Sequence, residues 1–243
     1  MKKVELVLPN GHLSRYVAGL LRTAGYSLPE YGPGTRNFRP TINESHMDIR
    51  VTRPLQIAID LARSDADVGI TGLDCLCEFP GGVLLLDLER PATSLDLMIP
   101  KHEFDHISTF EDFLEFALSH SATIFSEFPS YVRRYIGAHP AYRSTCKEPP
   151  QLDVAWTVIA STSPIVVRLS FGSTEGNEFF VDCVDTGNTA EINGCKRIHS
   201  FLERSTPYLA ASSQALLDPY KAEKIRDIVS RLKLALKSTD PRP

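Results

Sequence analysis

Short apolar runs alternate with segments of helical periodicity along the first part of the chain. Residues 4–8 form an apolar run that ends at a Pro-Asn-Gly turn, and the apolar residues that follow recur at the spacing of one helix face until Gly25. Residues 50–52 are then typical of a strand, Pro54 begins a helix to about residue 62, and residues 67–70 form a buried strand. This alternation predicts an α/β sheet.

The same two kinds of pattern continue further along the chain. Residues 138–163 are rich in Pro, Ser and Thr and show no clear periodicity, so we expect an elaborated loop there. The predicted strands lie in residues 83–99 (two runs), 124–125, 166–170 and 179–184, and the predicted helices follow Thr109, begin at Pro129 and cover residues 221–236. A second α/β lobe is therefore expected to begin near residue 100.

Composition and charge restrict the classes of function. Apolar residues make up 42% of the 243 residues and charged residues 23%, which is typical of a folded domain with a sizeable core. The net charge of −4 gives no bulk attraction to a nucleic acid. No apolar run approaches the roughly 18 residues of a membrane span, and the first eight residues do not resemble a secretory signal. We expect a cytoplasmic protein with neither nucleic acid nor membrane as a partner.

Two acids and a Thr-Gly-Asn-Thr turn follow the buried strand near residue 180. The unpaired N–H groups of a helix start suit a phosphate, glycine allows close backbone approach, and the two acids suit ribose hydroxyls or a magnesium ion. An ordinary N-capped turn gives the same pattern, so both interpretations stay open at this point. The acids are Asp182 and Asp185, and the turn consists of Thr186, Gly187, Asn188 and Thr189.

Other candidate ligand residues lie after predicted strands or in loops. Two further turns place small or hydroxyl residues beside an acid, and ligands of open α/β sheets sit beyond the carboxyl ends of strands. Arginine pairs with phosphate oxygens through two parallel hydrogen bonds, although a lone surface arginine is usually only solvated. The candidates are Gly72 and Asp74 in one turn, Ser173 and Thr174 in the other, and the arginines Arg36, Arg39, Arg53 and Arg133.

Metal-binding patterns are weak in this sequence. Residues 102–106 match the His-Glu-x-x-His pattern of zinc proteases, but they follow Pro100 and precede a helix cap, so we expect a loop rather than the required helix. The five cysteines are odd in number and lack paired spacing, which favours reduced thiols over disulfides or zinc.

Several of these segments together resemble the ATP phosphoribosyltransferases that open histidine biosynthesis. Residues 66–74 (ADVGITGLD) are similar to the family's ADLGITGLD segment, and residues 182–193 resemble its diphosphate-loop motif DLVETGTTLRAN. Residues 4–13 look like the amino-terminal strand and LPKGRL loop, residues 127–135 look like the EFPNLTRRYF helix start, and residues 202–206 follow the closing pattern. The resemblance covers nearly the whole chain.

This resemblance implies an α/β, two-lobed fold of the type II periplasmic-binding-protein kind with the active site in the interlobe cleft. Lobe I would comprise residues 1–99 and 203–243, and lobe II residues 100–202 would carry the phosphoribosyl diphosphate loop. The implied reaction joins N1 of ATP to the anomeric carbon of 5-phosphoribosyl 1-diphosphate and releases pyrophosphate, with Mg²⁺ as the cofactor.

The resemblance also assigns roles to the candidate residues. Asp182 and Asp185 would orient the ribose hydroxyls, with Asp182 as a ligand of Mg²⁺. The phosphoribosyl diphosphate site would be formed by Asp185, Thr186, Gly187, Asn188, Thr189, Ser173 and Thr174. Nucleotide and phosphate groups would be bound by Asn10, Gly11, His12, Arg36, Arg39, Arg53, Gly72, Asp74 and Arg133.

Two departures from the family pattern keep alternatives open. Asn10 and His12 stand where the family usually has basic residues, which favours, as an alternative, a diverged phosphoribosyltransferase with another purine or heteroaromatic acceptor. A noncatalytic binding or regulatory paralogue is a third hypothesis, because the fold alone does not fix function.

The chain ends after residues 221–236, which resembles the short form that lacks the regulatory domain. Such forms imply a homo-oligomer or a hetero-oligomer with a histidyl-tRNA-synthetase-like regulatory subunit.

Overall fold

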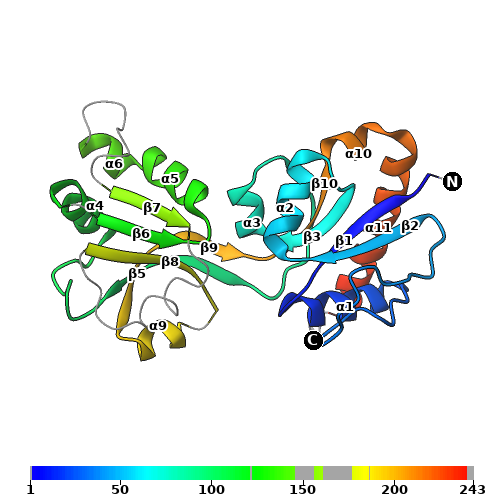
Figure 1. The fold of residues 1–243 in the computed structure, drawn as a ribbon, viewed down its shortest axis with the longest axis horizontal. Coiled ribbons are helices and arrows are strands. Elements are labelled where there is room, and N and C mark those ends of the chain that lie inside the picture. The colour runs from blue at the N-terminus through cyan, green and yellow to red at the C-terminus, as the bar shows by residue number, and fades with distance from the viewer. Residues whose placement is uncertain (1, 121, 146–155, 161–176, 186, 240–243) are drawn as a thin grey trace. The chain divides into compact units, whose positions relative to one another are not determined.

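The computed structural model describes residues 2–120, 122–145, 156–160, 177–185 and 187–239. Within these residues the chain forms two compact units, unit 1 (residues 1–92 and 206–243) and unit 2 (residues 93–205). Each unit contains one five-stranded sheet (Figure 1). The α/β, two-lobed fold class expected from the sequence is confirmed.

Unit 1 has a mixed sheet in the order β2-β1-β3-β10-β4. Strands β1, β2 and β3 are parallel, whereas β10 runs antiparallel to both β3 and β4. Its elements are β1 (Val4–Pro9), α1 (Leu13–Thr23), β2 (Met47–Thr52), α2 (Pro54–Arg63), β3 (Val68–Gly72), α3 (Leu73–Glu78), β4 (Gly82–Asp87), β10 (Pro207–Ser212), α10 (Ser213–Leu217) and α11 (Pro219–Thr239).

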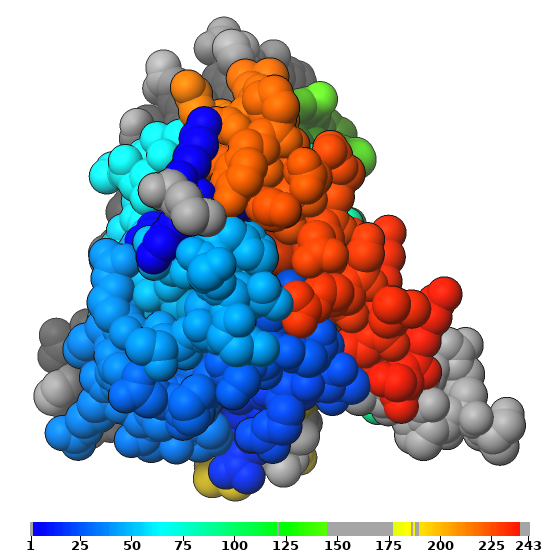
Figure 2. Space-filling view, turned by 90° about the vertical axis from the view of Figure 1, so that its right-hand side faces the viewer, coloured from blue at the N-terminus to red at the C-terminus, as the bar shows by residue number. Residues whose placement is uncertain are grey.

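The two faces of this sheet are covered by different helices. Alternate residues of β1, including Leu6 and Leu8, pack with α1 and with Ile225 and Leu232 of α11 in one hydrophobic core. Figure 2 shows α11 in red beside the blue amino-terminal segment that contains α1. Helix α2 covers the other face, where a Cβ on Gly69 would lie 2.5 Å from the Ile57 side chain. Glycine in β3 therefore allows α2 to pack closely on the sheet.

Unit 2 has the strand order β7-β6-β8-β5-β9. Strands β6, β7 and β8 are parallel, and β5 lies antiparallel between β8 and β9. Its elements are β5 (Thr93–Pro100), α4 (Phe110–Ser119), β6 (Ala122–Ser126), α5 (Pro129–Ala138), α6 (Pro140–Thr145), β7 (Trp156–Ala160), β8 (Asn177–Val184), α9 (Asn188–Ile192) and β9 (Cys195–Ser205).

The faces of the unit 2 sheet also differ. Helices α4, α5 and α6 lie on one side of the sheet and α9 lies on the other (Figure 1). On the α4 side an aromatic cluster fills the core, and His199 stacks on Phe110 with ring centroids 4.2 Å apart. On the α9 side a smaller core joins Phe180, Met98 and Cys195 to Ala190 of α9. The Thr109 cap predicted for α4 is confirmed, because its side chain and that of Asp112 form a capping box.

Two expectations differ from the structure and a third is not tested by it. The units meet at residues 92/93 and 205/206 rather than at 99/100 and 202/203, because the whole of β5 and β9 pairs within unit 2. Residues 138–163 are not a plain loop, since they include α6 and β7. The strand expected at residues 166–170 lies outside the described residues.

Candidate functional site

The carboxyl ends of three parallel strands meet at one edge of the unit 1 sheet. β1 pairs with β2 up to Pro9 and Thr52, and with β3 through Val7 and Gly69. The segments that follow these strands therefore lie at one edge, which is where α/β sheets bind ligands. The predicted residues that the structure brings together there are Asn10, Gly11, His12, Arg53, Gly72 and Asp74.

The loop after β1 is held by its backbone, which leaves polar side chains for other contacts. The N–H of Asn10 donates to the Thr52 carbonyl at 2.8 Å, and Gly11 adopts φ +71°, a left-handed conformation that favours glycine. Buried Tyr31 donates to the Pro9 carbonyl at 2.8 Å. The side chain of His12 is exposed and makes no capping bond at the start of α1. Its ring therefore remains available at this edge.

The turn after β3 places a buried carboxylate directly over a glycine. A Cβ on Gly72 would lie 2.3 Å from Oδ1 of Asp74, although the backbone angles of Gly72 (φ −67°, ψ 149°) suit any residue. Oδ1 of Asp74 accepts a 2.6 Å hydrogen bond from the N–H of Cys75. Close approach of the carboxylate, and not an unusual backbone conformation, accounts for glycine at position 72.

The three arginines predicted for unit 1 do not share one location. Arg53 is exposed at the start of α2, directly at the strand-end edge. Nη1 of Arg39 donates to Glu5 at 2.8 Å, and Glu5 lies four residues before the end of β1, about 13 Å away along the strand. In the structure Arg39 therefore pairs with an acid of the sheet, and its assignment to a nucleotide or phosphate group stays a prediction. Arg36 is exposed in the same loop, two residues before Phe38, whose carbonyl accepts from Val51 of β2.

The acids predicted for unit 2 lie at the end of β8. Asp185 is exposed immediately after this strand, and Gly187 adopts φ +78° before α9 begins. Asp182 is half-buried within β8 and is paired across the sheet with Asp96 of β5. Because directly opposed residues share a face, the two carboxylates are neighbours on the α9 side.

The other predicted residues of unit 2 are placed only in part. Arg133 is exposed on α5, beyond the carboxyl end of β6, and β6 is parallel to β8. Ser173, Thr174 and Thr186 lie outside the described residues. Asn188 and Thr189 belong to α9, but the description does not extend to their side chains.

A pocket of about 410 Å³ lies at the predicted phosphate turn. Three cations that were not predicted from the sequence line it together with the predicted Asp185 and Gly187. The lining residues are Ser94 and Met98 of β5, Lys101, Val184, Asp185, Gly187, Ala190 and Glu191 around α9, and Cys195, Lys196 and Arg197 of β9. Basic and hydroxyl side chains beside the turn give this pocket the chemistry of an anion site.

Lys101 and Lys196 differ in the hydrogen bonds that their ammonium groups make. Nζ of Lys196 donates to the Asp105 carbonyl at 3.0 Å. Burial raises the pKa of the Cys195 thiol, and the positive charge of Lys101 acts in the opposite direction, which places that charge close to the thiol. Within the described ranges, the ammonium of Lys101 has no hydrogen-bond or ion-pair partner.

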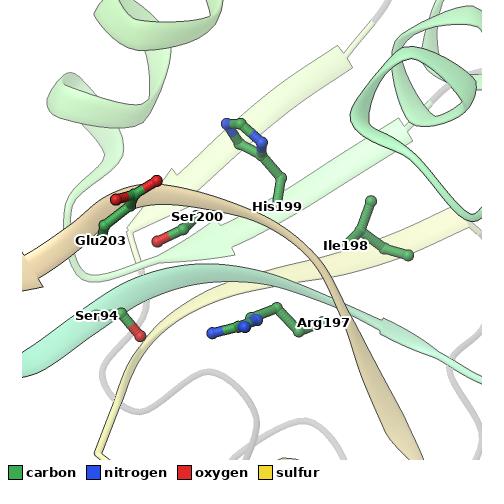
Figure 3. A pocket seen from close by; sticks show the side chains of 6 residues that line it. All are labelled: Ser94, Arg197, Ile198, His199, Ser200 and Glu203. Atoms are coloured by element: carbon green, nitrogen blue, oxygen red, sulfur yellow. The ribbon is translucent and has the colours of Figure 1, made fainter.

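A second pocket of about 450 Å³ shares two of its residues with the first. It is lined by Ser94, Arg197, Ile198, His199, Ser200 and Glu203. Figure 3 shows the Ser94 hydroxyl and the Arg197 guanidinium pointing toward one another, whereas the His199 ring points away from Arg197. Arg197 therefore borders both pockets.

Metal coordination by protein side chains alone has no support in the described part of the chain. No group of three His, Cys, Asp or Glu side chains there is suited to hold a metal ion. The His-Glu-x-x-His pattern at residues 102–106 lies in turns, as expected, and not in a helix. No helix in that part of the chain is both long and apolar enough to span a membrane.

Comparisons with known proteins identify the family of the chain. Residues 53–234 match the family HisG: ATP phosphoribosyltransferase. ATP phosphoribosyltransferase 1 of Geobacter sulfurreducens is 25% identical over 241 residues, covering 94% of this chain and 71% of that protein. An ATP phosphoribosyltransferase of Methanococcus maripaludis is 24% identical over 234 residues, covering 95% of this chain and 72% of its own length.

Solved structures show the same fold. The ATP phosphoribosyl transferase (HisG:HisZ) complex from Thermotoga maritima superposes with a TM-score of 0.69 at 16% identity, covering 97% of this chain and 99% of that one. The alkanesulfonate-binding protein SsuA from Xanthomonas axonopodis pv. citri gives 0.51 at 8% identity, over 97% of this chain and 73% of its own. Since the family match spans three quarters of the sequence, the chain belongs to the HisG family of ATP phosphoribosyltransferases.

Proposed function

We propose that this protein transfers the phosphoribosyl group of 5-phosphoribosyl 1-diphosphate to N1 of ATP and releases pyrophosphate, the first step of histidine biosynthesis. The observation that carries the proposal is the family match over residues 53–234, which includes Arg53, the Gly72–Asp74 turn and the segment from Asp182 to α9. In each unit these residues lie at strand ends, where α/β sheets bind ligands.

The reaction is a displacement at the anomeric carbon. The bond from adenine N1 to this carbon forms as the bond to the diphosphate oxygen breaks, and the electron pair leaves with pyrophosphate. Positive charge develops on the ribose ring while negative charge grows on the leaving group. Catalysis then rests on positioning and on fixed charges, and no covalent enzyme nucleophile is needed.

The residues of unit 2 suit the phosphoribosyl donor. Asp185 is exposed beside the glycine turn, so its carboxylate is accessible to accept hydrogen bonds from the ribose hydroxyls. Gly187 lets the backbone approach a phosphate at the start of α9. The neighbouring Asp182 and the opposed Asp96 would add negative charge near a ribose ring bound at this turn, which would favour the positive charge of the transition state.

Magnesium fits this site as an ion held mainly by the substrate. Mg²⁺ commonly uses one or two carboxylates together with substrate phosphates and waters, and Asp182 and Asp185 supply two carboxylates. When bound, the ion neutralises negative charge on the departing diphosphate. In unit 1, Arg53 and the loop at Asn10 and His12 would contact the ATP, with Gly72 and Asp74 beside them.

We extend the proposal to assembly and location. The Thermotoga maritima relative is a complex of two kinds of subunit, which supports a hetero-oligomer with a histidyl-tRNA-synthetase-like regulatory subunit for this chain as well. A cytoplasmic location, where ATP and the sugar donor are available, stays a prediction.

The test is direct detection of the product. Purified protein is incubated with ATP, 5-phosphoribosyl 1-diphosphate, Mg²⁺ and pyrophosphatase, with and without the candidate regulatory subunit, and phosphoribosyl-ATP is measured by mass spectrometry. Asp185→Asn is expected to lower turnover by at least a hundredfold. Asp65→Asn, the same change at an exposed residue after α2, serves as the matched control.

The same experiment separates the competing hypotheses. Product that is lost in Asp185→Asn and retained in Asp65→Asn supports the proposal. The absence of product under both conditions, together with turnover of another purine or heteroaromatic acceptor, would replace it with a diverged phosphoribosyltransferase. Binding of ligands without turnover of any acceptor would indicate a noncatalytic paralogue.

A further inference from the structure

Strand β9 carries an arginine next to an irregularity in its pairing with β5. The β5–β9 register places Met98 opposite Arg197 and Leu97 opposite His199, so Ile198 is an extra residue in β9. A bulge of this kind changes the face to which the following side chains point. Arg197 therefore lies on the α9 side with Met98, whereas His199 lies on the aromatic side with Leu97.

A second irregularity brings a serine to the same face. Asp96 is opposite Ser200 and Leu95 is opposite Leu202, so Phe201 is also an extra residue. Because opposed residues share a face, Ser200 joins Asp96 on the α9 side of the sheet. Arg197, Asp96 and Ser200 thus come together from two strands.

Asp96 is buried in a way that needs an explanation. Its side chain is 0% exposed, and its Oδ2 accepts bonds from the Ser94 hydroxyl at 2.7 Å and from Nη1 of Arg197 at 3.4 Å. Its Oδ1 is buried, as is Oγ of Ser200, and neither has a hydrogen-bond partner among the described residues. A buried carboxylate that is only partly paired costs stability, so its presence is better explained by a role than by folding.

The guanidinium of Arg197 has most of its binding capacity left. Its side chain is 63% exposed, and Asp96 is its only polar partner in the described parts of the chain. Arginine has five N–H donors, of which this contact uses one. The pairing therefore fixes the orientation of the guanidinium. Its other N–H donors can bind a ligand in either of the two pockets that Arg197 lines.

We propose that Arg197 and Lys101 form an anion subsite for a phosphate group of the phosphoribosyl donor, and that Asp96 is a positioning residue that orients Arg197. The proposal rests on the proposed function for the identity of the ligand. Both cations line the pocket that contains Asp185 and Gly187, so a phosphate group bound at this turn would share the pocket with them. The Asp96–Arg197 pair also places a positive charge beside the opposed carboxylates of Asp96 and Asp182.

Direct binding measurements test the subsite without requiring turnover. Inorganic pyrophosphate and ribose 5-phosphate are titrated separately into the full-length protein by calorimetry at fixed ionic strength. Arg197→Gln is expected to raise the Kd of at least one of these probes about ten- to a hundredfold, because hydrogen bonds to a charged group are lost. The probe that is affected identifies the end of the donor that Arg197 contacts. Arg63→Gln, at an exposed residue of unit 1, is the matched control.

The role of Asp96 is tested by its dependence on Arg197. Asp96→Asn is expected to raise the Kd of the same probe about three- to tenfold, and to have no further effect in an Arg197→Gln background. The melting temperature of Asp96→Asn is expected to stay the same or to rise, because a poorly paired buried charge is removed. Equal loss of affinity in both backgrounds would show that Asp96 is merely structural.

The outcomes also distinguish this inference from the proposed function. Wild-type affinity of Arg197→Gln for both probes, or no binding of either probe to the unsubstituted protein, would overturn the subsite even if phosphoribosyl-ATP is formed. Conversely, loss of probe binding in Arg197→Gln upholds the subsite even if ATP is not the acceptor. If Arg197→Gln fails to fold, Arg197→Lys keeps the charge with fewer donors and is expected to give an intermediate Kd.

Discussion

Replacing Gly72 by alanine tests the close contact at the edge of unit 1. The added Cβ would lie 2.3 Å from Oδ1 and 3.2 Å from Cγ of Asp74, so the carboxylate must move away. Its displacement breaks the 2.6 Å hydrogen bond from the N–H of Cys75. The backbone of Gly72 already has angles that alanine adopts, so the steric conflict with Asp74 is the main cost.

The magnitude follows from the bond that is lost. A hydrogen bond to a charged group contributes about 1.5–3 kcal/mol to stability. Replacing glycine by alanine offsets about 0.4–1 kcal/mol of this loss, because it lowers the conformational entropy of the unfolded chain. We expect Gly72→Ala to lower the free energy of unfolding of unit 1 by about 1–2 kcal/mol. Gly19→Ala, on an exposed position of α1 with no atom within 4 Å of the new Cβ, is expected to raise it by up to about 1 kcal/mol.

Urea unfolding followed by circular dichroism measures these changes. The single tryptophan, Trp156, lies in β7, so its fluorescence reports separately on unit 2. The decisive comparison is a double-mutant cycle with Asp74→Ala, which removes the carboxylate before the methyl group is added. In that background Gly72→Ala should be neutral or slightly stabilising. An equal loss of stability in both backgrounds would refute the steric argument.

Three further predictions concern a cap, a histidine and the nucleotide loop. Thr109→Ala removes half of the capping box of α4 and is expected to lower the free energy of unfolding of unit 2 by about 1 kcal/mol in urea. The control Glu115→Gln, on the exposed face of the same helix, should change this free energy by less than about 0.5 kcal/mol. Burial, and to a lesser extent the charge of the nearby His139, lowers the pKa of His199. The His199 ring therefore binds a proton more readily in the unfolded chain than in the folded one. The free energy of unfolding of unit 2 should therefore decrease as the pH falls below about 6.5. His199→Phe should remove this part of the pH dependence in unfolding followed by fluorescence. Asn10→Lys with His12→Arg should lower the Kd of ATP about tenfold or more in calorimetry, since it adds two cations at the strand-end loop. One cation added at the other end of α1, in Thr23→Lys, should have little effect.

The parts of the fold that could be predicted are those encoded by local pattern. The buried strand expected at residues 67–70 is β3 (Val68–Gly72), Pro54 begins α2 as expected, and Thr109 caps α4 as expected. Parallel strands are buried on both faces, so they appear in the sequence as continuous apolar runs. The candidate residues that directly follow such strands, among them Arg53 and Asp185, could be placed at strand ends for the same reason.

The residues that were missed lie on strands whose faces a local pattern does not define. In a regular strand Arg197 and His199 would share a face, and the extra residue Ile198 separates them. Within its own strand Asp96 accepts a hydrogen bond from Ser94, and its partner in the neighbouring strand, Arg197, is 101 residues away. The adjacent basic residues Lys196 and Arg197 are visible in the sequence, but only the pairing of β9 with β5 shows where in the fold they lie.

The distribution of charge over the two units suggests how the two substrates would be held. At the strand ends of unit 1, Asn10 and His12 carry no permanent positive charge and Arg53 is an exposed cation, whereas Arg39 lies further along the sheet and is paired with Glu5. In unit 2, Lys101 and Arg197 stand beside the phosphate turn with binding capacity left. Because charge pairing weakens as salt screens it, affinity for the phosphoribosyl donor should fall with ionic strength more steeply than affinity for ATP. Electrostatic attraction would then favour the donor, whereas shape and hydrogen bonding at the Gly72–Asp74 turn would contribute more to binding of the acceptor.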